Sequence, residues 1–142
     1  MCIRDSPKEI KTDENRVGLT PASVREFVLH GHSVIVEAGC AFKLGLTDEE
    51  YRDAGATLTS DLDQLFEADM IVKVKEPQPE EVARLHKGQI LFTYLHLAPD
   101  PKPTSDLINS ECTAIAYETV TDGQGRLPVS YTHLTLPTTP YV

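Results

Sequence analysis

The sequence has few basic residues, no long apolar run and no closely spaced cysteines, and each absence excludes a class of protein. Lys and Arg total 13 against 22 Asp and Glu, and the net charge of −9 argues against a nucleic-acid surface, which needs a basic stripe. No apolar stretch reaches the length of a membrane span, and the N-terminus lacks the apolar stretch of a signal peptide. We therefore expect a globular protein that binds neither nucleic acid nor membrane.

Cysteine usage excludes a disulfide or metal framework. Cys2, Cys40 and Cys112 are far apart, and no CxxC pair occurs. Such spacing is typical of a reducing compartment, so we expect no metal and a cytoplasmic location.

A glycine-rich nucleotide loop is also missing. Gly123-Gln-Gly125 is the nearest match to GxGxxG, but Pro128 occupies the position of the last glycine and no helix pattern follows. A flexible turn is the better interpretation. The sequence predicts no cofactor-binding residues within this chain.

The two ends of the chain look foreign to the rest. Residues 1–6 read MCIRDS, and Val129–His133 read VSYTH, followed by LTLPTTPYV. One coding DNA for the first segment, ATGTGTATAAGAGACAG, has a reverse complement that encodes Val-Ser-Tyr-Thr-His. This resembles a transposon-end adapter translated at both ends of a fragment. We therefore expect native sequence only from about Pro7 to Pro128, with residues 1–6 and 129–142 non-native and excluded from fold reasoning.

What is present is an alternation of strand and helix patterns. It predicts an α/β domain with a mainly parallel sheet flanked by helices. Helices are expected to open at Thr20-Pro21 and at the capping-box pattern Thr47–Glu50. The predicted strands are 33–37, 56–59, 70–74, 90–94 and 113–116, and further helices are predicted at 60–68, 79–86 and 103–110.

Three basic residues lie in loops directly before or after these predicted elements, where we expect one edge of the sheet. Lys75 comes just after the strand MIVKV, His96 just after ILFTY, and Arg16 lies in the loop before the first helix. Ligands of parallel sheets bind beyond the carboxyl ends of the strands. A guanidinium, an ammonium and an imidazole meeting there would suit a small 2-oxo acid.

Each residue also has a simpler interpretation. Alone, Arg16 and Lys75 are best explained as surface residues, and His96, between two leucines, fits a core histidine about as well as a catalytic one. Three further assignments are made on pattern: Lys73 points to the face opposite Lys75, Asp13-Glu14 is a solvated acidic pair, and Glu118 is a surface carboxylate, with orientation of a basic group as the alternative.

Several segments, in order, resemble the N-terminal part of alanine dehydrogenase. They are PKEIKTDENRVGLTP, GHSVIVEAG, DEEYRDAGA, ADMIVKVKEPQPEE, GQILFTYLHLA and TAIAYETV, ending in DGQGRLP, and they are spread along residues 7–128. The resemblance implies a Rossmann-like substrate-binding domain of an enzyme that deaminates L-alanine to pyruvate and ammonia with NAD. It also implies a homohexameric parent.

The resemblance assigns roles to the three basic residues. Arg16 would hold the substrate carboxylate, Lys75 would bind near the carbonyl oxygen, and His96 would be the acid/base. NAD would be bound by a domain that this chain lacks, so we expect the chain alone to be inactive.

Two alternatives stay open. The nicotinamide nucleotide transhydrogenase α subunit shares an RVxxTP segment with this chain, although the KVKEP and TYLHLA segments favour the dehydrogenase. The other alternative is a non-catalytic, poorly folding truncated piece.

Overall fold

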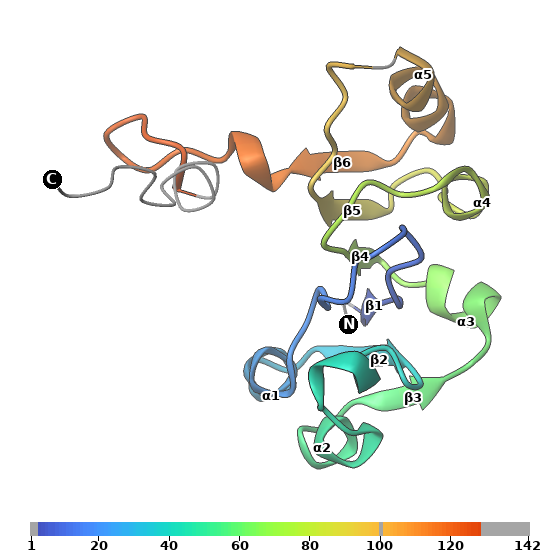
Figure 1. Cartoon of the computed structure of the whole chain (residues 1–142), viewed down its shortest axis with the longest axis vertical. Coiled ribbons are helices and arrows are strands. Elements are labelled where there is room, and N and C mark those ends of the chain that lie inside the picture. The colour runs from blue at the N-terminus through green and yellow to red at the C-terminus, as the bar shows by residue number, and fades with distance from the viewer. Residues whose placement is uncertain (1–2, 100, 129–142) are drawn as a thin grey trace, which may run out of the picture.

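A six-stranded sheet in which every neighbouring pair is parallel forms the centre of the molecule (Figure 1). The computed structural model describes residues 3–99 and 101–128. The strands occur in the order β3-β2-β1-β4-β5-β6. This is the doubly wound order, with its switch point between β1 and β4. The strands are β1 (Ile3–Ser6), β2 (Ser33–Glu37), β3 (Thr57–Thr59), β4 (Met70–Val72), β5 (Ile90–Thr93) and β6 (Thr113–Ala116).

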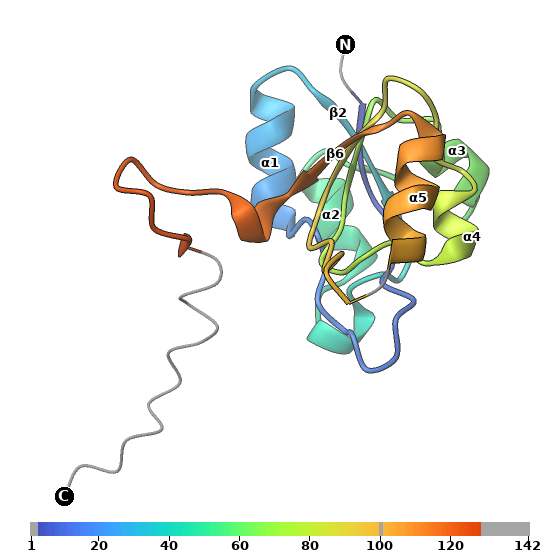
Figure 2. The same cartoon turned by 90° about the horizontal axis from the view of Figure 1, so that it is seen from above.

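Helices cover both faces of the sheet. Figure 2 shows α1 and α2 on one face and α3, α4 and α5 on the other. The helices are α1 (Pro21–Leu29), α2 (Asp48–Asp53), α3 (Leu62–Phe66), α4 (Pro79–Val82) and α5 (Pro101–Ser110), with short 3-10 helices η1 (Phe42–Leu44) and η2 (Tyr117–Thr119). The predicted fold class is confirmed.

Local signals placed two helix starts correctly. The Thr20 hydroxyl accepts a hydrogen bond from the Ser23 backbone N–H at the start of α1. At α2, the Thr47 hydroxyl accepts from the Glu50 N–H while the Glu50 carboxylate accepts from the Thr47 N–H, which is a complete capping box.

Several predicted boundaries were wrong for identifiable reasons. Strand β4 ends at Val72 rather than 74, and the Val74 N–H donates to the Glu9 carboxylate. Helix α3 is shorter than 60–68 because the Asp61 side chain caps it one residue before Leu62. Helix α4 ends at Val82 rather than 86, and the turn beyond it is tightened by bonds of the i to i−3 type.

Helix α5 begins at Pro101, two residues earlier than predicted. Proline is tolerated there because the N–H groups of a first helical turn have no partner inside the helix.

The core consists of one apolar cluster on each side of the sheet. On the α1 and α2 side, Val24 and Tyr51 pack on Val34 and Val36 of β2. On the other side, residues of α3 and α5 pack on Ile71 and Leu91, and that cluster comprises Leu65, Phe66, Ala68, Ile71, Leu85, Leu91, Leu95 and Leu107. Both faces of the central strands are therefore covered, as in other parallel sheets.

The N-terminal segment that was set aside on sequence grounds forms the central strand. Strand β1 pairs with β2 from Ile3↔Ser33 to Ser6↔Val36 and with β4 at Arg4↔Met70 and Asp5↔Ile71. Ser6 is fully buried, and its hydroxyl accepts from the Leu19 N–H at 3.3 Å. The other suspect segment, 129–142, lies outside the described residues.

The described helices include none long and apolar enough to cross a membrane. Gly123–Gly125 lies in a turn, as predicted, in which the Gly125 N–H donates to the Asp122 carbonyl oxygen.

Candidate active site at the carboxyl edge of the sheet

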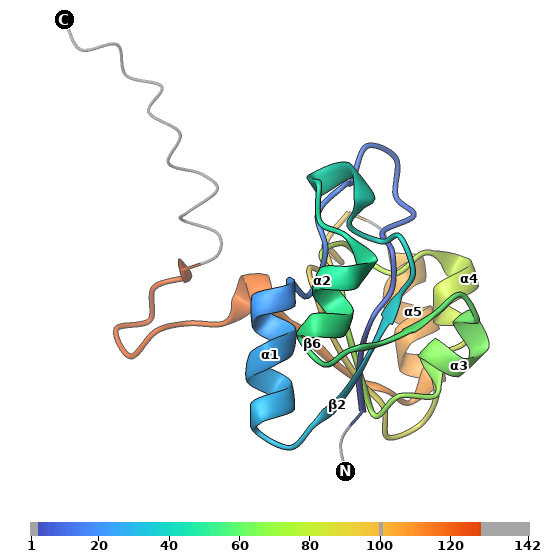
Figure 3. The ribbon, with the colours of Figure 1, turned by 90° about the horizontal axis from the view of Figure 1, so that it is seen from below.

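The three basic residues predicted from the sequence lie on loops at one edge of the sheet. Arg16 is on the loop after β1, Lys75 follows β4 and His96 follows β5, which are adjacent strands. In Figure 3, the loop after β1 and the helix η1 project together from the sheet at the end opposite the N-terminus. The predicted placement on a shared carboxyl edge is confirmed, and it is the edge where the switch point lies.

The ring of Tyr94 brings Lys75 and His96 together. The Lys75 Nζ lies 5.1 Å from the centroid of that ring, within the range of a cation–π contact. The imidazole of His96 stacks on the same ring with the centroids 5.7 Å apart and the planes at 23°. The Tyr94 hydroxyl is 3.5 Å from His96 Nδ1. The ammonium and the imidazole therefore share one aromatic support.

His96 is exposed and takes an unusual backbone conformation. Its φ is +48°, in the left-handed region. A non-glycine residue there is strained by roughly 1–3 kcal/mol, and such strain is typical of functional sites. The interpretation of His96 as a core histidine was therefore wrong.

Arg16 is tied to the neighbouring Glu14. Its Nε donates to Glu14 Oε1 at 2.9 Å and its Nη2 to Oε2 at 2.6 Å, while its backbone N–H also donates to Oε1 at 2.8 Å. These bonds hold the pKa of Glu14 at about 2, below its ordinary value of 4.5. The side chain of Glu14 is only 8% exposed, so its assignment to a solvated acidic pair was wrong.

Arg16 is linked to the Lys75 and His96 group by electrostatics. The positive charge of Lys75 helps to lower the pKa of Glu14, the partner of Arg16. Burial raises the pKa of Tyr117, and the charge of Arg16 opposes that rise. The Tyr117 ring lies 6.2 Å from that of Tyr94, and its hydroxyl donates to the Val74 carbonyl oxygen. Lys75 and His96 thus contact Tyr94 directly, whereas Arg16 acts on Tyr117 through its charge.

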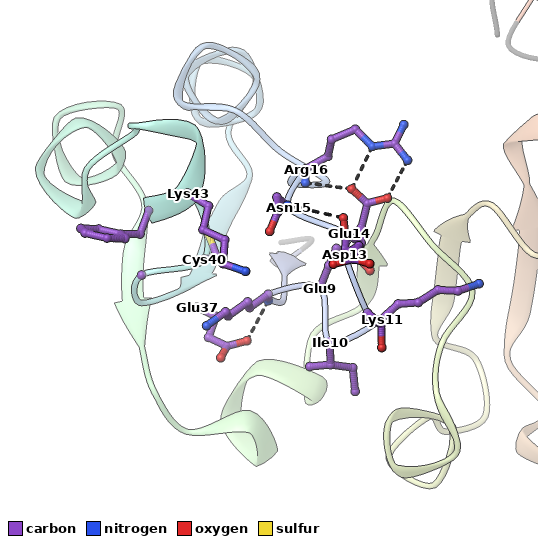
Figure 4. A pocket seen from close by; sticks show the side chains of 14 residues that line it. Glu9, Ile10, Lys11, Asp13, Glu14, Asn15, Arg16, Glu37, Cys40 and Lys43 are labelled. Carbon is purple, nitrogen blue, oxygen red and sulfur yellow. Dashed lines mark hydrogen bonds and ion pairs between the residues drawn. The ribbon is translucent and has the colours of Figure 1, made fainter.

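A cavity of about 600 Å³ opens beside this group, between the loop after β1 and the loop after β2. Figure 4 shows Glu37, Cys40 and Lys43 on its far wall, with the Arg16 guanidinium pointing away from them over Glu14. Arg16 and Glu14 contribute to its lining, whereas Lys75 and His96 do not. Burial raises the pKa of Cys40 to about 11, so its thiol stays protonated and unreactive at neutral pH.

Beneath Lys75 lies a buried charge network that the sequence did not reveal. Lys73 Nζ contacts Glu9 at 3.2 Å and Glu81 at 2.7 Å, and the three side chains are 1%, 2% and 7% exposed. Lys73 lies in this buried network whereas Lys75 contacts the Tyr94 ring, which agrees with the prediction that the two side chains point to opposite faces. A lysine followed six residues later by a helix N-terminus rich in glutamate was the only signal in the sequence.

Glu118 is half-buried, and its Oε1 accepts the backbone N–H groups of Leu95 at 2.9 Å and His96 at 3.1 Å. The interpretation as a surface carboxylate was wrong, and the alternative, in which Glu118 orients a basic group, stays a prediction, because these bonds hold the backbone of His96 and not its imidazole. Glu14, Tyr94 and Tyr117 were also missed. Glu14 and Tyr94 lie two positions before Arg16 and His96, and this proximity was the signal in the sequence; no such signal pointed to Tyr117.

The loop after β1 does not fit a dinucleotide. That loop holds a single glycine, Gly18, and a Cβ there would collide with the Val72 carbonyl group of β4. Gly18 therefore serves close packing between loop and strand, and not the approach of a pyrophosphate. Within residues 3–99 and 101–128, no cluster of three His, Cys, Asp or Glu side chains could hold a metal ion.

Comparison with known proteins identifies relatives of this arrangement. Residues 6–132 match the family described as alanine dehydrogenase/PNT, N-terminal domain. The alanine dehydrogenase of Halomonas elongata is 52% identical over 124 residues, which are 87% of this chain and 33% of the relative. That of Bacillus subtilis is 49% identical over 118 residues, 83% of this chain and 31% of the relative.

Solved structures give the same result. An L-alanine dehydrogenase superimposes with a TM-score of 0.86 at 44% identity, over 89% of this chain and 35% of that one. A transhydrogenase from Sinorhizobium meliloti gives 0.77 at 28% identity, over 82% of this chain and 35% of that one. The chain thus spans about a third of the length of the curated relatives it matches.

Proposed function

The chain belongs to the alanine dehydrogenase/PNT N-terminal domain family, and we propose that it is the substrate-binding part of an NAD-dependent L-alanine dehydrogenase. Such an enzyme converts L-alanine and water into pyruvate and ammonia while NAD accepts a hydride. The observation that carries the proposal is that Lys75 and His96, on the loops after β4 and β5, both contact the Tyr94 ring, while Arg16 lies on the loop after β1, the other neighbour of β4.

Arg16 is proposed to bind the substrate carboxylate. Glu14 occupies the guanidinium edge formed by Nε and Nη2, and Nη1 takes no part in that pair. Because a guanidinium has five N–H donors, the edge formed by Nη1 and Nη2 can receive a second carboxylate with two parallel hydrogen bonds. Glu14 then fixes the direction in which Arg16 presents this edge.

Lys75 is proposed to donate from Nζ to the 2-oxo oxygen of pyruvate. Charge builds on this oxygen when the carbonyl carbon is attacked, and a positioned ammonium stabilises it. The contact with Tyr94 fixes the ammonium without neutralising it, because an aromatic ring accepts no proton.

His96 is proposed as the acid/base. Its Nδ1 faces the Tyr94 hydroxyl, which leaves Nε2 for the substrate. During deamination, Nε2 would take a proton from the attacking water and return one to the departing ammonia.

A transhydrogenase domain is the second candidate, and it is favoured by the structural match to the Sinorhizobium meliloti protein. The sequence identity to that protein is 28%, against 44% for the solved L-alanine dehydrogenase. The higher identity supports the dehydrogenase.

A hybrid enzyme tests the proposal. Residues 7–128 of this chain replace the matching segment of the Halomonas elongata enzyme, and the rest of that enzyme is kept on both sides. We expect NADH formation that depends on L-alanine, and we expect His96→Ala to lower kcat by roughly 10²–10⁴-fold while the Kd for NAD is unchanged. The exposed His86 supplies a matched control, His86→Ala, which should keep full activity.

Three outcomes would contradict the proposal. A folded hybrid enzyme that is inactive with L-alanine would remove the assignment of the reaction. Hydride exchange between two nicotinamides without L-alanine turnover would support the transhydrogenase instead. Full turnover by His96→Ala would remove His96 from the acid/base role.

A further inference from the structure

In each of the loops that carry His96 and Lys75, one carboxylate oxygen accepts hydrogen bonds from two consecutive backbone N–H groups. After β5, the N–H groups of Leu95 and His96 both donate to Glu118 Oε1, at 2.9 and 3.1 Å. Glu118 belongs to η2, which directly follows β6, the strand next to β5. The neighbouring strand therefore supplies the acceptor at the point where β5 ends.

The same device occurs after β4. The N–H groups of Val74 and Lys75 both donate to Glu9 Oε1, at 2.6 and 3.4 Å. Glu9 lies on the loop that follows β1, and β1 is the strand next to β4. In both loops, the second N–H of the pair belongs to the residue with a proposed chemical role.

We propose that Glu118 and Glu9 are positioning residues, which fix the backbone of His96 and of Lys75 for the reaction without touching the substrate. The proposal rests on the proposed function for the roles of His96 and Lys75. A hydrogen bond to an ionised acceptor is stronger than one between neutral groups, and two bonds on one oxygen fix the direction of a peptide segment. Displacing a reacting group by about 1 Å can lower a rate about 100-fold, so a loop that ends a strand needs such a restraint.

The backbone conformation shows why His96 needs the restraint more than Lys75. The φ of His96 is +48°, which an unrestrained loop would relax, whereas Lys75 is outside the left-handed region. With the backbone in this conformation, the imidazole of His96 stacks on the ring of Tyr94. Loss of the Glu118 acceptor therefore frees the residue to leave both the strained backbone and the ring.

Glu118→Ala and Glu118→Gln in the hybrid enzyme separate geometry from charge. Glutamine keeps an acceptor oxygen at the same place, whereas alanine removes it. We expect Glu118→Ala to lower kcat by about 10- to 100-fold with the Kd for NAD unchanged, and Glu118→Gln to stay within about 3-fold of the parent. The pH dependence of kcat should keep the same inflection in both variants, because His96 is still the acid/base.

Amide hydrogen exchange gives a readout that does not need activity. The peptide that contains Leu95 and His96 should exchange faster in Glu118→Ala than in the parent, and at the parent's rate in Glu118→Gln. Glu49→Ala is the matched control, since its side chain is 77% exposed and it should change neither exchange nor kcat. Glu9→Gln keeps an acceptor for Val74 and Lys75 but removes a charge that pairs with Lys73, so the Val74 and Lys75 peptide should exchange more slowly in Glu9→Gln than in Glu9→Ala.

The outcomes are distinct. If the hybrid enzyme never turns over L-alanine, the proposed function fails, and the exchange measurement still tests the restraint. If Glu118→Ala keeps the parent's kcat and exchange rate, the positioning role is overturned. If Glu118→Gln loses as much kcat as Glu118→Ala, the charge of Glu118 is what matters, and the role of its geometry is overturned.

Discussion

Replacing Lys73 by methionine tests whether the buried charge network supports the loop of Lys75. Lys73 is the only cation that Glu9 and Glu81 contact in the part of the chain described by the structure, and all three side chains are at most 7% exposed. Methionine keeps most of the volume of the lysine stem, so the change removes a charge rather than creating a large cavity.

The expected loss of stability is about 3–5 kcal/mol, the usual result of removing one partner from a buried ion pair. Backbone N–H groups compensate part of the remaining charge: Glu9 accepts from Val74 and Lys75, and Glu81 accepts from Gln78. These bonds place the expectation at the lower end, near about 3 kcal/mol. Domains are stable by only about 5–15 kcal/mol, so such a loss is easily measured.

The loss should depend on pH. Burial already raises the pKa of Glu81 even with Lys73 present, and without the ammonium the pKa of Glu81 rises further. A group whose pKa is raised in the folded state contributes stability that is present below its unfolded pKa and lost as the pH rises through the folded value. The deficit of Lys73→Met should therefore be largest at neutral pH and shrink as the pH falls toward about 4.5.

Urea unfolding of the 142-residue chain, followed by circular dichroism between pH 4.5 and 7.5, measures this deficit. The matched control is Lys87→Met, because Lys87 pairs with Glu111 on the surface, where the side chains are 80% and 59% exposed. That change should cost no more than about 0.5 kcal/mol. A deficit for Lys73→Met below about 1 kcal/mol, or one independent of pH, would refute the reasoning.

Three further predictions concern the loop after β1. Gly18→Ala should destabilise the chain by about 1–3 kcal/mol in the same urea assay, because its Cβ meets the Val72 carbonyl group; unchanged stability would mean that the loop can move away. Glu14→Gln should lower stability by about 1 kcal/mol above pH 4.5, a figure that allows for the 51% exposure of Arg16. The pKa of Glu14 is lower in the folded than in the unfolded chain, so the difference from the parent should disappear as the pH falls toward 2. A difference that persists at pH 2 would contradict this prediction. In the hybrid enzyme, Arg16→Lys should raise the KM for L-alanine by about 10-fold or more with the Kd for NAD unchanged, because an ammonium cannot form the two parallel bonds; an unchanged KM would remove Arg16 from substrate binding.

Local chemistry explains how much of the fold could be predicted from the sequence. Thr20 and Thr47 bind N–H groups within the next three residues, so their helices could be located from neighbouring letters alone. The alternation of strand and helix patterns likewise indicated a parallel sheet, and a parallel sheet placed Arg16, Lys75 and His96 at its carboxyl edge. Edge placement follows from topology and needs no knowledge of side-chain contacts.

The remaining features of the site depend on contacts between residues far apart in the sequence. Glu9 contacts Lys73 and accepts a hydrogen bond from Val74, which lies 65 positions later. Glu118 accepts a hydrogen bond from His96, which lies 22 positions earlier. Nothing in the letters around a glutamate indicates which distant backbone it will meet. Strand β4 was predicted two residues too long for the same reason, because the carboxylate that takes the Val74 N–H lies in another part of the chain.

Strand β1 shows how far backbone pairing can proceed without a favourable sequence. A strand between two covered faces is normally a run of apolar residues, and IRDS is not one. The strand nevertheless pairs with both neighbours, because parallel ladders are made by backbone groups that every residue other than proline carries. We therefore propose that β1 occupies the place of a native strand whose residues were replaced by adapter-derived ones. The gene recovered from source DNA should then encode an apolar strand before Pro7. An intact gene that encodes MCIRDS at this position would overturn the proposal. The site depends on that strand, because the loop bearing Glu9, Glu14 and Arg16 begins where β1 ends.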